Sequence, residues 1–218
     1  ITATAATPPS SITQHGNLLS SGNIALDATT TIDFDGTIGA TTSIGGDLSI
    51  GTITTTANVD LADAVSVDGL ISITGANVLV GGAMSADANT AGNEALTISA
   101  TDAAANTLTV NNSLTTNSGA ITLSAKDDVI FGAAGSLASN NGNIGVAADS
   151  DGSGGAISMT SGATINSGTG TITLSADEDI ALGALTTTNP TSTAITVTSD
   201  SGSIMQAGEF LSITGGSS

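Results

Sequence analysis

Short apolar pairs return along the chain at nearly constant intervals. Each pair has the form Ile/Leu-x-Ile/Leu/Val, with a small or hydroxyl-bearing residue at the middle position. The pairs begin at Ile24, Leu48, Ile71, Leu96, Ile121, Ile144, Ile172 and Ile195, in steps of 24, 23, 25, 25, 23, 28 and 23 residues. Such alternation has the period of a strand with one buried face. A regular repeat of this length predicts one strand-turn unit stacked many times.

The two fullest copies of the repeat span residues 119–132 and 170–183 and are identical at eight of fourteen positions. Both read Gly-x-Ile-x-Leu-x-Ala, with a second apolar residue eight places after the first; looser copies begin at Gly22 and Gly69. These second apolar residues, Ile32, Leu79, Val129 and Ile180, predict a second strand. A third strand is drawn through Leu114, Leu137 and Ile165.

Three short strands per turn predict an all-β fold, a right-handed parallel β-helix (solenoid) of about nine rungs of ~24 residues, because parallel crossovers are right-handed by default. At a rung spacing of ~4.8 Å the rod would be about 40 to 45 Å long. We assign residues 1–16 to a lead-in or capping segment and 17–218 to the repeat domain. The end rungs need caps or further repeats, so we expect adjacent repeats in a longer parent chain.

The pattern Gly-x-Ile-x-Leu-x-Ala-x-x-Asp-Ile-x-Leu-Gly of residues 170–183, with its partner copy at 119–132, resembles the repeats of filamentous-haemagglutinin-type adhesins. These are large bacterial surface proteins exported by two-partner secretion. The likeness covers most of the chain from about Gly22 onward. It implies a shaft segment, secreted to the bacterial cell surface, that mediates attachment to a host or neighbouring cell surface or to other copies of the fibre.

Composition narrows the core and the partners. Hydrophobic residues make up 39% of the chain but aromatic residues only 1%, which favours a narrow interior of stacked aliphatic side chains. The chain has no Cys, which excludes disulfides and thiolate metal sites. One Lys against 19 acidic residues gives a net charge of −18, which would repel nucleic acid and anionic lipid. No apolar run approaches the roughly 18 residues of a membrane span.

Parallel β-helices include pectin-degrading enzymes, so we searched for catalytic groups. The lyases need a basic residue beside Ca²⁺, and here Lys126 is the one candidate base. The hydrolases use an Asp cluster with His-Gly and Arg-x-Lys; His15-Gly16 is present, but the chain has no Arg. Without an assembled set of groups we expect no enzymatic activity. We also expect Phe34 and Phe131 to point inward, which leaves no Trp or Tyr for stacking on sugars.

Acidic residues recur five to seven places after the first apolar residue of a repeat. They are Asp102, Asp127, Asp128, Asp149, Asp151, Asp177, Glu178, Asp179 and Asp200. Stacking would align them along one corner, where carboxylates ~4.8 Å apart repel by roughly 1 kcal/mol in water. No cofactor is required, but Ca²⁺ would relieve the repulsion. We name Asp127, Asp128, Asp149, Asp151, Asp177 and Asp179 as candidate ligands, with a solvated acidic face as the alternative.

Thr triplets are a second surface feature, at residues 29–31, 54–56 and 186–188. Regular outward Thr arrays can order water and bind ice, although Thr is also an ordinary solvent-facing strand residue. The sequence therefore favours a structural and adhesive shaft. The alternative is a Ca²⁺-dependent or ice-binding module, and an enzyme on the same scaffold ranks third.

Overall fold

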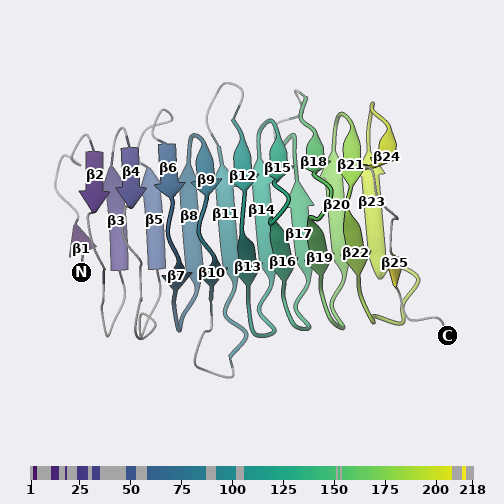
Figure 1. The fold of residues 1–218 in the computed structure, drawn as a ribbon, viewed down its shortest axis with the longest axis horizontal. Helices are drawn as coiled ribbons and strands as arrows, with labels where there is room; N and C mark the ends of the chain where they lie inside the picture. The colour runs from purple at the N-terminus through teal and green to yellow at the C-terminus, as the bar shows by residue number, and fades with distance from the viewer. Residues whose placement is uncertain are drawn as a thin grey trace.

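The chain folds as a parallel β-solenoid, seen as a row of stacked strands in the computed structural model (Figure 1). The structure describes residues 58–86, 92–101, 106–150, 152 and 154–207, and also 2–3, 11–14, 18, 24–28, 31–34, 48–52 and 213–214. Every regular element in these ranges is a strand, and they hold no helix long and apolar enough to cross a membrane.

The strands form three parallel sheets. Sheet A contains β1 (Thr2–Ala3), β3 (Ile24–Ala28), β5 (Leu48–Thr52), β8 (Ile71–Gly75), β11 (Leu96–Ala100), β14 (Ile121–Ala125), β17 (Ile144–Ala147), β20 (Ile172–Ala176) and β23 (Ile195–Ser199). Sheet B contains β2 (Ser11–Gln14), β4 (Thr31–Phe34), β6 (Asn58–Leu61), β9 (Val78–Val80), β12 (Leu108–Val110), β15 (Val129–Phe131), β18 (Ile157–Met159), β21 (Ile180–Leu182) and β24 (Ile204–Gln206). Sheet C contains β7 (Val65–Ser66), β10 (Met84–Ser85), β13 (Ser113–Thr115), β16 (Ser136–Ala138), β19 (Thr164–Asn166), β22 (Ala184–Thr186) and β25 (Ile213–Thr214).

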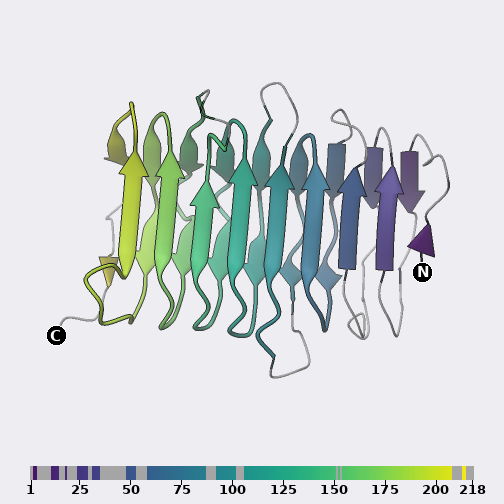
Figure 2. The same cartoon turned by 180° about the vertical axis from the view of Figure 1, so that it is seen from behind.

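Each turn of the chain visits the three sheets in the order A, B, C. Five consecutive turns, from β8 to β22, supply one strand to every sheet. The predicted lead-in segment supplies β1 and β2, which pair with β3 and β4. The longer strands of sheet A form one broad face of the rod (Figure 2).

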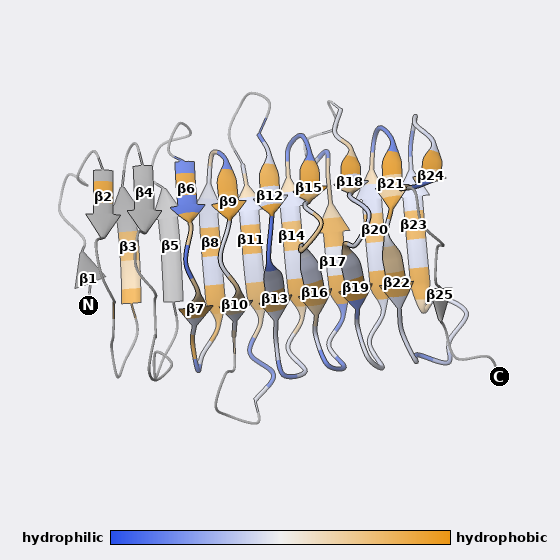
Figure 3. Ribbon diagram, in the orientation of Figure 1, coloured by the Kyte–Doolittle hydropathy of each residue, from blue (hydrophilic) through white to orange (hydrophobic). Residues whose placement is uncertain are grey.

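The core consists of columns of aliphatic side chains that run along the rod. All eight predicted first-strand residues, from Ile24 to Ile195, are direct register partners in sheet A. The predicted third strand is confirmed as well, because Leu114, Leu137 and Ile165 pair in sheet C and are buried. Figure 3 shows the alternation of apolar and polar residues within the strands of sheet A.

The predicted second strand is wrong at one residue. Val78, not Leu79, lies in register with Val59 and Leu108, and Leu79 faces outward with 36% of its surface exposed. The corner between β8 and β9 has two residues, whereas three separate β14 from β15. Because side chains alternate between the two faces of a strand, this shift of one residue exchanges the inner and outer positions.

The glycine that opens each repeat allows the rungs to stack closely. A Cβ atom on Gly119, Gly142 or Gly170 would lie 1.9 to 2.1 Å from a carbonyl oxygen of the preceding rung, so no side chain fits there. Buried hydroxyl groups satisfy the carbonyls of these same glycines. Thr116 donates to the Gly119 carbonyl at 2.6 Å, and Ser167 and Thr187 donate to that of Gly170 at 2.8 and 2.7 Å.

Candidate functional site

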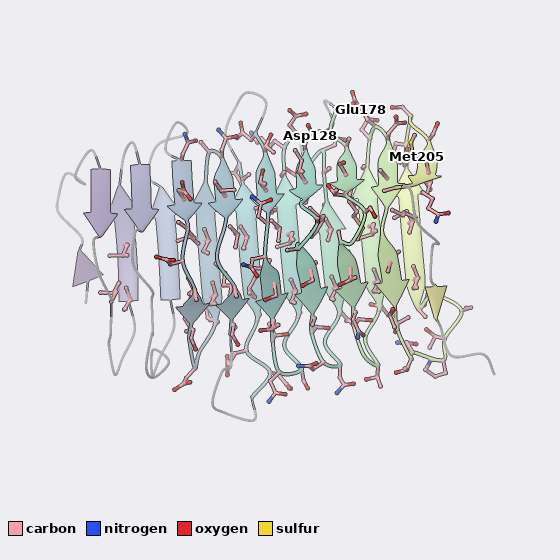
Figure 4. All side chains as sticks on the ribbon, in the orientation of Figure 1. Asp128, Glu178 and Met205 are labelled. Atoms are coloured by element: carbon pink, nitrogen blue, oxygen red, sulfur yellow. The ribbon has the colours of Figure 1, made fainter. Side chains whose placement is uncertain are left out.

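The acidic residues gather at the corner between sheets A and B. Residues 126–128 connect β14 to β15, residues 177–179 connect β20 to β21, and Asp200 directly follows β23. Backbone hydrogen bonds stack these corners, from the Asp149 N–H to the Asp127 carbonyl at 3.3 Å and from the Ser201 N–H to the Asp177 carbonyl at 2.7 Å. Asp128 and Glu178 lie on the same edge of the rod in Figure 4.

Two of the candidate Ca²⁺ ligands already bind the backbone of the next rung. Asp128 Oδ1 accepts a hydrogen bond from the Ala156 N–H at 2.9 Å, and Asp179 Oδ1 accepts one from the Ser203 N–H at 2.7 Å. These amides stand at the start of a sheet B strand, where the corner leaves them without a ladder partner. The two carboxylates therefore have a structural role.

Asn residues make the same contact earlier in the rod. Asn58 Oδ1 accepts from the Asn77 N–H at 3.2 Å, and Asn77 Oδ1 accepts from the Thr107 N–H at 2.9 Å. We call Asn58, Asn77, Asp128 and Asp179 the Asx ladder. Sequence analysis missed it, although its signal is visible: each member directly precedes the first inward-facing residue of its sheet B strand.

The corner that contains Asp149 is an outward bulge, which explains the longest step of the repeat. Asp149, Gly152, Gly154 and Gly155 all have positive φ angles of 69°, 77°, 107° and 144°. Gly155 is also sterically required, because a Cβ atom there would lie 2.6 Å from the Asp127 carbonyl oxygen. The Gly-rich segment therefore lets the chain double back while the rungs stay in contact.

The acidic side chains do not converge on one point in the described part of the chain. There, no three carboxylate or imidazole groups are close enough together to hold a metal ion. Asp151, the sixth candidate ligand, and Asp102 lie outside the described residues. The Ca²⁺ site stays a prediction, and for Asp128 and Asp179 it competes with the Asx ladder.

The other predicted positions fall in different surroundings. His15 and the Phe34 side chain lie outside the described residues, whereas Phe131 is fully buried as predicted. Thr54–56 and Thr29–30 also lie outside them. In the triplet 186–188, Thr187 is fully buried, so this triplet does not form an outward face.

An ordered hydroxyl surface exists elsewhere, on the outer face of sheet A. We call it the hydroxyl face. One column contains Ser72, Thr97, Thr122, Gly145, Thr173 and Thr196, and the next contains Thr74, Ser99, Ser124, Ala147, Ser175 and Thr198. Ser99 and Ser124 are hydrogen bonded at 2.9 Å. Strands β8, β11, β14, β17, β20 and β23 contain no charged residue.

Comparisons with known proteins give no relative for this chain. No protein-family model matches it, and neither a curated protein nor a solved structure is significantly similar to it.

Proposed function

We propose that the chain is a non-enzymatic shaft segment of a large secreted fibre on a bacterial cell surface. The observation that carries this proposal is the in-register pairing of every sheet A strand from β3 to β23 with its neighbours, over a core of aliphatic columns. Continuous pairing makes a stiff rod whose stability is a sum of rung and neighbour terms. The proposal also rests on the resemblance of residues 119–132 and 170–183 to adhesin repeats.

The shaft in this proposal is a right-handed solenoid of about nine rungs, which continues into adjacent repeats of its parent. Its partners are a host or neighbouring cell surface. The rod presents two surfaces for such a contact, the acidic corner and the hydroxyl face. The corner is the stronger candidate, because Glu178 and Asp179 are exposed side by side there.

Cell binding tests the adhesive part of the proposal. Labelled chain is added to candidate cells and abiotic surfaces, with Ca²⁺ and with chelator in parallel. Saturable binding is expected, and the variant Asp177→Asn/Glu178→Gln/Asp200→Asn should weaken it if the corner makes the contact. Thr164→Gln, on the outer face of sheet C, is the matched control. Absence of binding under both conditions would leave the chain as a spacer without an adhesive site.

The hydroxyl face favours ice binding as a second candidate function. Its two columns repeat at the strand spacing of ~4.8 Å and along each strand at about twice the residue rise, and charge does not interrupt them. The parent chain should then arrest ice growth, measured as thermal hysteresis. Thr122→Lys/Thr173→Lys should abolish the effect and Thr164→Lys should preserve it. An unmodified chain without thermal hysteresis would contradict this function.

A further inference from the structure

Burial falls sharply at the outer strands β23 and β24. Ile180 is fully buried, but its register partner Ile204 is 49% exposed and the neighbouring Met205 45%. In sheet A, Ile172 and Leu174 are buried, whereas their partners Ile195 and Val197 are only partly so. Figure 4 places Met205 at the yellow end of the rod. Within the described residues no strand pairs with the outer side of β23 or β24, so backbone donors and acceptors are open there.

The opposite edge of the same sheets continues the same columns. The sheet B column that ends at Ile204 starts at Ile12, which packs partly against the core. The neighbouring column runs from Gln14 through Phe34, Leu61, Val80, Val110 and Phe131 to Met159. One rung beyond Leu182 it reaches Gln206. Glutamine therefore occupies the register position at both edges of an otherwise apolar column.

We propose that a second copy of this chain stacks on the rod end to end, with its β1 and β2 edges against β23 and β24. The junction would repeat the contact that every described rung makes with the next one. Ile204 would cover Ile12 of the second copy, and Gln206 would meet Gln14, as in the amide ladders of stacked strands. The contact is heterologous and does not close on itself, so it leads to linear filaments.

Charge opposes this contact and sets its dependence on salt. The chain carries a net charge of −18, and Asp179 and Asp200 are exposed in the two rungs nearest this edge. Like charges on two copies repel each other, and salt screens that repulsion over roughly 10 Å at 0.1 M. Self-association should therefore strengthen as NaCl rises. Association that weakens with salt would overturn the proposed apolar and backbone junction.

Cross-linking gives the sharpest test, because the chain has no native Cys. In the double variant Gln14→Cys/Gln206→Cys, an in-register junction brings the two Cα atoms to ~4.8 Å, within the range of a disulfide. The two positions within one chain are about eight rungs, or roughly 38 Å, apart. Mild oxidation should give a ladder of linked oligomers that dithiothreitol reverses.

A register control accompanies the double variant. In Gln14→Cys/Met205→Cys the second thiol lies on the opposite face of β24, one residue away, so oxidation should give little linkage. Equal linkage in both variants would indicate random collision and overturn the proposal. Exclusively monomeric product from Gln14→Cys/Gln206→Cys would overturn it too.

Sedimentation of chains without added thiols is an independent measurement. Ile204→Asp should weaken self-association at least about tenfold, because it places a charge in the junction. Leu79→Asp, on the same sheet in mid-rod, should associate like the parent. Circular dichroism checks that both variants fold. Equal association of Ile204→Asp and the parent would contradict the junction. The inference goes beyond the shaft and adhesion proposals, since cell binding is measured on dilute monomer and either result can fail alone.

Discussion

At the scale of single residues, the corners decide how closely the rungs stack. Gly119, Gly142 and Gly170 form one column in which each rung's glycine lies against backbone of the rung before it. The buried hydroxyls of Ser139 and Ser167 fill the adjoining space and donate to the carbonyls of Gly142 and Gly170. The repeated Gly is thus a packing requirement.

Gly170→Ala tests this requirement. The added methyl group would meet the Gly142 carbonyl oxygen at 2.0 Å, so the rungs must separate and the free energy of unfolding should fall by about 2 kcal/mol. The matched control is Gly145→Ala, because a Cβ atom there has nothing within 4 Å. Urea denaturation should show the control unchanged or up to about 1 kcal/mol more stable. Equal losses in both variants would contradict the packing role.

Asp128 separates the structural role of the acidic corner from a metal role. Asp128→Asn keeps an oxygen acceptor for the Ala156 N–H, as Asn58 and Asn77 do in their rungs. We expect it to leave stability unchanged or slightly higher, since it also removes a negative charge. Asp128→Ala should cost about 1 kcal/mol. Thermal unfolding measures both, and a loss for Asn as large as that for Ala would exclude the Asx ladder as the main role.

At the scale of the strands, the sequence pattern predicted much of the architecture. The first-strand columns and the third strand at Leu114, Leu137 and Ile165 were predicted correctly because apolar residues recur there at fixed intervals. The error at Leu79 has a local cause, since a corner shortened by one residue leaves Val78 and Leu79 equally apolar in sequence. Hydrogen bonds of the Asx ladder were missed because they join residues about 20 to 30 positions apart.

Substitutions in β9 test the corrected register. Val78 is fully buried and Leu79 is 36% exposed. Val78→Asp should destabilise the protein by about 3 to 5 kcal/mol, because it leaves an unpaired charge in the core. Leu79→Asp should change stability by no more than about 0.5 kcal/mol. Denaturation midpoints at equal slope give both values, and the reverse order would restore the register inferred from sequence.

At the scale of the whole molecule, charge and surface chemistry are segregated. The corner between sheets A and B holds Asp127, Asp128, Asp149, Asp177, Glu178, Asp179 and Asp200. The neighbouring hydroxyl face holds only neutral residues. A stack of rungs superimposes each surface type on itself, so the rod repeats any contact that a single rung makes. This multiplies weak contacts along the shaft.

Salt and Ca²⁺ act on this segregated charge in different ways. NaCl should raise the Tm, because it screens repulsion along the acidic corner. The Ca²⁺ hypothesis predicts a further rise at millimolar CaCl₂ over NaCl of equal ionic strength, since a bound ion adds its own stabilisation. Calorimetry compares the two salts, with Asp177→Asn/Asp179→Asn as the control that should lose the difference. Equal Tm values would leave the corner as a solvated acidic face.

The central claim is that this chain is a shaft that bears load, and single-molecule pulling tests it most directly. A molecule held at its two ends should resist extension and then unfold in discrete steps. Each step should release one rung or a small multiple, about 80 Å of contour for ~24 residues. A force–extension curve without unfolding events, like that of an unstructured chain, would contradict the account.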